Sequence, residues 1–248
     1  MVGCDAYIFK EGYFVLGYTK SGTNWLCLMI SRYLGMPVFE PWIDYNRGNG
    51  PYVFHLHRFL PLSGARKRTV YLMRDGRDAV ISRYHAMLDQ PGQSREREQF
   101  SRIIGCIPTA EDITQHLPAW IEFLRKTARS SVDWKRHVER GLREYPHRVR
   151  YLDLKERAVQ TMSGVIKHLT GNEADLHILA EVVDYYSFDR MKERAIGDRY
   201  AASFLRLGAA GSWRKVFDRK SAEVFAHYAG QTLIDAGFEK SNSWIRDF

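Results

Sequence analysis

The chain has 248 residues, of which 45% are apolar and 27% are charged. This composition excludes collagen, disordered acidic segments and disulfide-rich miniproteins, and the sequence has no run of 18 apolar residues that could span a bilayer. The formal net charge of +8 favours anionic partners, but it does not distinguish a nucleotide from a nucleic acid or an acidic glycan.

Strand-like and helix-like segments alternate along the chain. The apolar run at residues 13–17 predicts a buried strand, and a Lys-Ser-Gly turn leads from it into a helix with an apolar face. Within residues 89–130, Pro91-Gly92 and the polar stretch after it predict a mobile loop. Further strands are predicted at residues 52–56, 69–73 and 148–152, and further helices at about 75–88, 114–126, 131–145, 159–169 and 221–236.

This alternation is typical of an α/β fold with helices on both faces of its sheet. We expect a P-loop-like three-layer α/β/α architecture with a central, mostly parallel sheet, formed as a single domain over residues 1–248. Ligands of such folds bind at the carboxyl ends of the strands. The cysteines are scattered without metal-ligand spacing, and the first strand begins too early for a signal peptide, so we expect a cytoplasmic protein.

The first motif is Tyr18-Thr-Lys-Ser-Gly-Thr-Asn-Trp25, between the first strand and the first helix. A helix start offers free N–H groups and a partial positive charge, so anions bind there. Lys20 adds a full charge, and Gly22 lets the backbone come close to a ligand. The motif indicates a phosphate cradle, although its order differs from the Walker A loop. The alternative is an ordinary turn capped by Ser21 or Thr23.

The second motif repeats this arrangement from Tyr71 to His85. Arg74 ends a strand, and Ser82 follows about two helical turns later. A guanidinium can bind a phosphate through two hydrogen bonds, and a hydroxyl can donate another. Alternatively, Arg74 pairs with Asp78 and Ser82 is a small packing residue.

Together these motifs resemble those of the cytosolic-type sulfotransferases, which use PAPS (3′-phosphoadenosine-5′-phosphosulfate). The family signature Y-P-K-S-G-T-T-W reads Y-T-K-S-G-T-N-W here, and the family's Arg and Ser, eight residues apart, match Arg74 and Ser82. The signature R-K-G-x-x-G-D-W reads R-L-G-A-A-G-S-W from Arg206, and T-S-F-x-x-M-K reads Y-S-F-D-R-M-K from Tyr186. The matches keep the family's order and span most of the chain.

The resemblance implies a role for each matching residue. Lys20, Ser21, Gly22, Thr23 and Asn24 would hold the 5′-phosphosulfate, and Lys20 would also stabilise the leaving phosphate. The implied 3′-phosphate ligands are Arg74, Ser82, Arg206 and Gly208, and the implied adenine contacts are Trp25, Tyr151 and Phe188. Leu207 replaces the family's Lys and Ser212 its Asp, so the tightness of nucleotide binding is in question more than its existence.

Transfer to a neutral hydroxyl also needs a general base. In the family this is the His of a K-T-H segment, and here the stretch reads His55-Leu-His57. His57 aligns with the base, and His55 falls at the family's Lys. Both face the same side of a strand, because side chains alternate with period two. We favour His57 because it is nearer the carboxyl end; His55 and, more distantly, Glu40 are alternatives.

The sequence thus predicts a PAPS-dependent sulfotransferase that acts on a hydroxyl of a small molecule or glycan and releases adenosine 3′,5′-bisphosphate. No metal is expected, because Lys20 and the backbone amides supply the positive field. A nucleotide or small-molecule kinase is the alternative enzyme, and a basic nucleic-acid-binding module is the alternative without catalysis, although no nucleic-acid-binding signature is present. Five aromatic residues between the motifs could line an acceptor pocket or pack in the core: Phe39, Trp42, Tyr45, Tyr52 and Phe59. The acceptor and the oligomeric state are left open.

Overall fold

The computed structural model describes residues 12–40, 51–59, 63–90, 93–127, 133–196 and 208–248. The chain divides into two compact units, each built from two stretches of sequence. The first unit comprises Met1–Arg74 and Arg140–Met191, and the second comprises Asp75–Glu139 and Lys192–Phe248. The prediction of a single domain over residues 1–248 stays a prediction.

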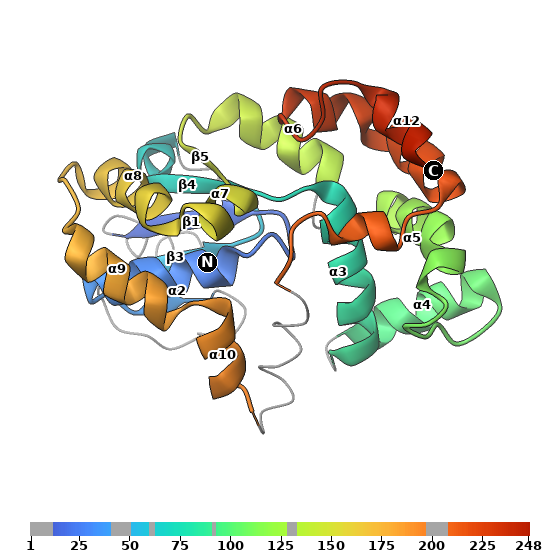
Figure 1. Ribbon diagram of the computed structural model, residues 1–248, viewed down its shortest axis with the longest axis horizontal. Helices are drawn as coiled ribbons and strands as arrows, with labels where there is room; N and C mark the ends of the chain where they lie inside the picture. The colour runs from blue at the N-terminus through green and yellow to red at the C-terminus, as the bar shows by residue number, and fades with distance from the viewer. Residues whose placement is uncertain (1–11, 41–50, 60–62, 91–92, 128–132, 197–207) are drawn as a thin grey trace, which may run out of the picture. The chain divides into compact units, whose positions relative to one another are not determined.

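The first unit contains a five-stranded sheet in the order β2-β3-β1-β4-β5, in which all pairings are parallel (Figure 1). Because β1 lies between β3 and β4, the chain leaves β1 toward one side of the sheet and later returns to its other side. Ligands of open α/β sheets bind at such a switch point. The strands are β1 (Tyr13–Gly17), β2 (Val38–Phe39), β3 (Val53–Leu56), β4 (Thr69–Met73) and β5 (Arg148–Arg150).

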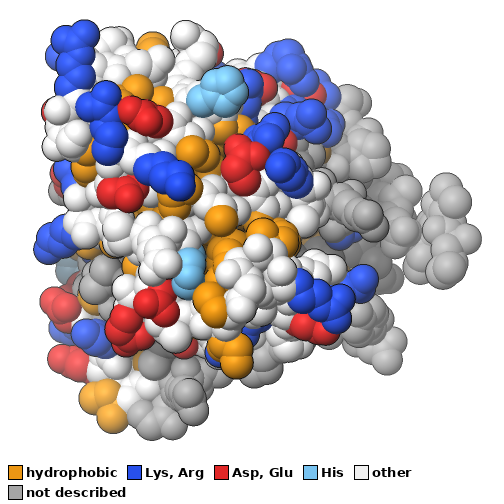
Figure 2. Space-filling model, turned by 90° about the vertical axis from the view of Figure 1, so that its right-hand side faces the viewer, with side chains coloured by type: hydrophobic (Ala, Val, Ile, Leu, Met, Phe, Trp, Pro, Cys, Tyr) orange, Lys and Arg blue, Asp and Glu red, His pale blue; other side chains and the backbone are white. Residues whose placement is uncertain are grey.

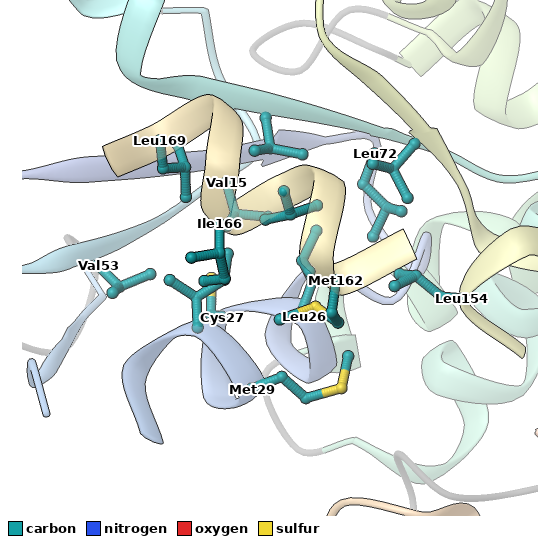
Figure 3. Packing of buried hydrophobic residues seen from close by; sticks show 14 of the residues in the cluster. Val15, Leu26, Cys27, Met29, Val53, Leu72, Leu154, Met162, Ile166 and Leu169 are labelled. Carbon is teal, nitrogen blue, oxygen red and sulfur yellow. The ribbon is translucent and has the colours of Figure 1, made fainter. Parts of the chain in front are cut away.

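One face of this sheet packs against helices whose apolar residues recur at helical spacing (Figure 3). Val15, Val53 and Leu72 contribute from the strands, and Leu26 and Met162 from the helices, to one buried cluster. The helices of this unit are α2 (Thr23–Leu34), α7 (Tyr151–Glu156), α8 (Ala158–Thr170), α9 (Leu176–Tyr185) and the start of α10 (Phe188–Arg194).

The opposite face of the sheet is aromatic. Phe14 and Phe54 stack across β1 and β3 with their ring centroids 4.9 Å apart, and Tyr71 on β4 stacks on Tyr145 at 5.9 Å. A Cβ atom added at Gly141 of α6 (Trp134–Glu144) would lie 2.1 Å from the Tyr71 ring. The short 3₁₀ helix η2 (Ser63–Arg68) precedes β4. The prediction of an α/β sheet with helices on both faces is therefore confirmed.

The described part of the second unit is helical, with an aromatic core. The guanidinium of Arg77 is 1% exposed, pairs with Asp75 and Glu239, and lies 3.7 Å from the Trp213 ring centroid. Its elements are α3 (Gly76–Asp89), α4 (Ser94–Ile104), α5 (Ile113–Thr127), the start of α6, η4 (Ser212–Lys215), α12 (Arg219–Asp235) and η5 (Asn242–Asp247).

Two sequence predictions need correction. The segment after Pro91-Gly92, predicted to be a mobile loop, contains α4, whose Phe100 is fully buried. This helix is rich in Arg and Glu, so it lacks the apolar periodicity that identifies a helix from sequence. The strand predicted over residues 148–152 is shorter in the structure: β5 ends at Arg150, and Tyr151 is the first residue of α7.

None of the helices described is long and apolar enough to cross a membrane.

On the face drawn in Figure 2, Lys and Arg side chains are interspersed with Asp and Glu. In the basic region at residues 125–150, Arg125 pairs with Glu122, and Arg140 and Arg143 pair with Glu144. Such exposed pairs are typical of a solvated surface and contribute little to stability.

Candidate nucleotide and sulfuryl-transfer site

The turn between β1 and α2 has the backbone geometry of an anion cradle. Lys20 has a φ of 67° and is the one non-glycine residue with a positive φ in the ranges described. Gly22 follows with a φ of 91° and caps α2 without a side-chain hydrogen bond. Successive residues with positive and negative φ turn their N–H groups toward one concave surface, and anions bind such surfaces. This backbone geometry is compatible with the phosphate cradle, which stays a prediction.

Ser21 provides a test of whether this turn fits an anion. The side chain is fully buried, and its hydroxyl has no hydrogen-bond partner among the described residues. A buried hydroxyl without a partner costs free energy. A phosphate or sulfonate oxygen at the turn would satisfy it, so the residues present fit the anionic end of the predicted ligand.

Gly22 is required by close packing as well as by its backbone angle. A Cβ atom there would lie 2.8 Å from the Tyr151 ring. We expect Gly22→Ala to lower stability by more than the strain of a positive φ, about 1–2 kcal/mol, and to weaken binding of adenosine 3′,5′-bisphosphate. Gly35→Ala is the matched control, since Gly35 has a φ of 66° but nothing within 4 Å of the added Cβ. Denaturation midpoints and ligand-induced melting shifts of both variants check this; equal losses would contradict it.

Arg74 joins the two sequence motifs. Its guanidinium Nη1 donates to the carbonyl of Lys20 at 2.9 Å, and the group lies 4.6 Å from the centroid of the Tyr151 ring. This contact is possible because β1 and β4 are adjacent and parallel, so both strands end at the same edge. Arg74 therefore braces the strained turn from the neighbouring strand. The three residues Lys20, Arg74 and Tyr151 meet at one site.

The aromatic residues predicted to contact adenine also gather at this edge. Trp25 lies edge-on to Tyr151 with ring centroids 5.9 Å apart, and its indole donates to the carbonyl of Tyr186 at 2.8 Å. Phe188 begins α10 after a short connection from α9. The Lys155 ammonium lies 6.0 Å from the Trp25 ring and 5.2 Å from the Phe188 ring. Two of the three rings thus share one cation.

Sequence reasoning did not identify Lys155. Burial lowers the pKa of Lys155 and the nearby Asp189 carboxylate raises it, with burial the larger cause. A partly desolvated ammonium beside two rings can donate to a purine nitrogen or to a phosphate. Its place one helical turn after Tyr151 on α7 is the signal that could have found it.

The two histidines of β3 lie together, with ring centroids 4.7 Å apart. The Nδ1 atom of His57 lies 2.9 Å from the carbonyl oxygen of Gly17. A carbonyl only accepts, so this nitrogen carries the proton and Nε2 of the neutral ring is an acceptor. His55 differs, because its Nε2 lies 2.6 Å from Thr23 Oγ1 and its Nδ1 lies 3.0 Å from Glu40 Oε1.

The remaining predicted ligands lie in the second unit or outside the described residues. Ser82 lies on α3, and Gly208 has a φ of 58°. Arg206 and Leu207 fall outside the described residues. The assignment of Ser82, Arg206 and Gly208 to a 3′-phosphate stays a prediction.

Asp78 holds the segment that follows Gly208. Its buried carboxylate accepts from the Gly211 N–H at 2.7 Å, the Ser212 hydroxyl at 3.0 Å and the Trp213 N–H at 3.0 Å. Ser212, which stands at the family's Asp, thus donates to a carboxylate. Sequence reasoning paired Asp78 with Arg74 or left it without a role, because these partners are more than 130 residues away in the chain.

We expect Asp78→Ala to destabilise the fold by about 3 kcal/mol, since three hydrogen bonds to a buried charge are lost. Ser212→Ala removes one of these bonds and leaves the two backbone donors in place, so its loss should be about 1 kcal/mol. Urea denaturation of both variants measures the difference. Equal stability of the Asp78 variant and the wild type would show that the carboxylate does not hold this segment.

The sequence and fold of this chain are similar to those of known sulfotransferases. The family described as "Sulfotransferase domain" matches residues 51–237. The chain belongs to the sulfotransferase family. It is 24% identical to human "Sulfotransferase 2A1", with 93% of this chain and 87% of the relative aligned. It is also 24% identical to "3-beta-hydroxysteroid sulfotransferase" of Cavia porcellus, with 89% of this chain and 83% of the relative aligned.

Solved structures show the same fold. Mouse sulfotransferase SULT7A1, crystallised in complex with PAP, superposes with a TM-score of 0.68 at 17% identity, over 96% of this chain and 87% of that one. A retinol dehydratase complex with androsterone and inactive cofactor PAP gives a TM-score of 0.56 at 15% identity, over 90% and 81% of the chains. The predictions of the family, the P-loop-like fold, a PAPS-dependent enzyme and PAPS as the sulfuryl donor are confirmed. The family match favours a sulfotransferase over the two alternatives, a kinase and a nucleic-acid-binding module.

Proposed function

We propose that this sulfotransferase transfers the sulfuryl group of PAPS to a hydroxyl of an apolar small molecule by in-line displacement, with His57 as the general base. The observation that carries the proposal is the contact between Arg74 and the carbonyl of Lys20, which joins the two predicted phosphate motifs at adjacent strand ends. Sulfuryl transfer, like phosphoryl transfer, depends mainly on positioning and on neutralising the charge of the leaving group.

The anionic end of the donor lies, in this proposal, at the turn before α2. The N–H groups of Gly22 to Asn24 and the hydroxyls of Ser21 and Thr23 donate to the phosphosulfate, while the N–H of Ser21 donates to the carbonyl of Tyr18 at 3.1 Å. Lys20 stabilises the charge that develops on the leaving phosphate. The adenine lies against Trp25, Tyr151 and Phe188, which suit a purine because aromatic faces stack on its ring. The assignment of Arg74, Ser82, Arg206 and Gly208 to the 3′-phosphate rests on the resemblance to the family's motifs alone.

The choice of base follows from the two hydrogen-bond patterns at β3. The Nδ1–H of His57 donates a hydrogen bond to the carbonyl of Gly17, so Nε2 of the neutral ring is an acceptor. His55 has both ring nitrogens engaged by Glu40 and Thr23 and is 6% exposed. A base must reach the acceptor hydroxyl through an accepting nitrogen. These contacts support His57 over both His55 and Glu40.

The acceptor is proposed from the relatives rather than from a pocket. One relative is named a 3-beta-hydroxysteroid sulfotransferase, and one solved structure holds androsterone. We therefore rank an apolar alcohol above a glycan hydroxyl. Packing partly explains the aromatic residues between the motifs, since Phe39 and Tyr52 contact each other and both contact the buried Phe54. Trp42 and Tyr45 lie outside the described residues. Cytoplasmic localisation remains part of this proposal.

Incubation with labelled PAPS tests the proposal. A 3β-hydroxysteroid, a long-chain alcohol, a phenol and a desulfated oligosaccharide are compared as acceptors, with release of adenosine 3′,5′-bisphosphate as a second readout. We expect label to move to the apolar alcohols most rapidly. Transfer to the oligosaccharide alone would overturn the acceptor class, and tight binding of ATP and Mg²⁺ without binding of adenosine 3′,5′-bisphosphate would overturn the donor site.

A further inference from the structure

Three polar side chains, of which two are buried and one is partly exposed, form a hydrogen-bonded series at the phosphate turn. Glu40 contacts His55 at 3.0 Å, and His55 contacts the hydroxyl of Thr23 at 2.6 Å. Thr23 and His55 are 3% and 6% exposed. Thr23 is the first residue of α2, which places its hydroxyl at the helix N-terminus where an anion binds. The other end of the series is a carboxylate, so a negative charge and the anion site are joined through one imidazole.

The protonation of His55 determines what the hydroxyl of Thr23 can do. An ionised carboxylate only accepts, so Nδ1 of His55 carries a proton toward Glu40. In the neutral ring Nε2 is then an acceptor, and the single proton of Thr23 points at it. In the doubly protonated ring Nε2 donates to Thr23 Oγ1 instead, and the proton of Thr23 is released toward the turn.

These two states differ in their affinity for an anion. With neutral His55, Thr23 turns oxygen lone pairs toward the turn and repels a phosphate. With protonated His55, Thr23 donates to the phosphate, and the imidazolium adds a positive charge beneath it. Hydrogen bonds from a charged donor are about twice as strong as neutral ones. Binding of an anion at the turn therefore favours uptake of a proton by His55.

We propose that Glu40 and His55 are positioning residues that aim the hydroxyl proton of Thr23 at the phosphosulfate, and that donor binding is coupled to protonation of His55. This inference rests on the proposed placement of PAPS at the turn. It assigns His55 a role other than that of the base, which belongs to His57.

The other titratable groups around His55 are compatible with this coupling. Glu40 lies next to it from the segment after β2, 3.0 Å from its Nδ1. The His57 ring is adjacent, and its Nδ1 proton is held by Gly17. Cys27 of α2 is fully buried, and burial, together with the charge of Glu40, raises the pKa of this thiol well above its usual value. Cys27 therefore stays neutral and does not compete with His55 for the proton.

Calorimetric titration with adenosine 3′,5′-bisphosphate tests the coupling. Repeating the titration in buffers of different ionisation enthalpy counts the protons taken up on binding. At a pH at which His55 is neutral in the ligand-free protein, we expect the wild type to take up about one proton when the ligand binds. In that range the affinity should fall about tenfold for each unit of pH. The ligand's own second phosphate ionisation, near pH 6, is common to all variants and cancels in their comparison.

Three variants separate this role from a merely structural one. His55→Lys supplies a permanent donor to both Glu40 and Thr23, so it should bind the ligand without proton uptake and keep its affinity at high pH. Thr23→Val removes the hydroxyl, so it should bind about tenfold more weakly and also without uptake. Glu40→Gln removes the carboxylate that accepts from Nδ1 of His55, so the orientation of Thr23 is less well fixed and the ligand should bind more weakly than to the wild type.

The outcomes distinguish the relay, by which we mean the coupling of donor binding to protonation of His55 through Thr23, from the donor site itself. Equal proton uptake by the wild type and folded His55→Lys, with melting temperature as the check on folding, would overturn the relay. Tight, pH-independent binding by the wild type would also overturn it and leave the proposed function standing. Failure of the wild type to bind adenosine 3′,5′-bisphosphate at all would instead overturn the proposed function.

Discussion

Replacement of Lys20 by Met is expected to abolish sulfuryl transfer while leaving the fold intact. The leaving phosphate gains negative charge as the sulfuryl group departs, and in the proposed mechanism the ammonium of Lys20 stabilises that charge. Removal of one positioned donor of this kind typically lowers turnover by about 10²- to 10³-fold. The methionine keeps the length of the side chain and leaves a non-glycine residue at the φ of 67°, so the strain of the turn is unchanged.

Single-turnover transfer from labelled PAPS measures this effect, and the melting temperature reports the fold. Lys167→Met is the matched control, because Lys167 is 61% exposed on α8 and pairs with the exposed carboxylate of Glu173. We expect the control to turn over at the wild-type rate. Turnover by the Lys20 variant close to that of the wild type would count against the whole assignment of the turn.

Replacement of His57 by Asn is expected to remove turnover but not donor binding. The Asn side-chain amide can still donate to the carbonyl of Gly17, which His57 contacts at 2.9 Å, but it has no basic nitrogen. Loss of a general base costs about 10²- to 10⁴-fold in rate. The dissociation constant of adenosine 3′,5′-bisphosphate should stay within about twofold of the wild type, since the base acts on the acceptor.

The pH dependence of turnover provides a second readout. In the proposed mechanism the unprotonated imidazole of His57 is the base, so wild-type turnover should rise with pH until the ring has lost its proton, and the Asn variant should lose this rise. His177→Asn is the control, because His177 is 84% exposed on α9 of the same unit. If folded His55→Lys is inactive while His57→Asn turns over normally, the base is His55 and our assignment is wrong.

The histidines show how far sequence reasoning reached at the site. The alternation of side chains along a strand placed His55 and His57 on one side, and their rings are adjacent. The same reasoning left Glu40 as a distant alternative base. Glu40 reaches His55 because β2 pairs in parallel with β3, which brings the residue after β2 beside the middle of its neighbour. A two-residue strand gives no periodic signal, so this pairing was not predictable.

The sequence by itself determined the family, the alternation of strands and helices, and the turn between β1 and α2 that is proposed to bind an anion, because these depend on residues close together in the chain. Strand periodicity, helix-ending glycines and the order Lys-Ser-Gly-Thr act over a few residues. Only the tertiary structure decided that Arg74 donates to the carbonyl of Lys20 and that Glu40, His55 and Thr23 are linked by hydrogen bonds. Those contacts join residues 15 to 54 positions apart, and they arise from the order of strands in the sheet, which local patterns do not specify.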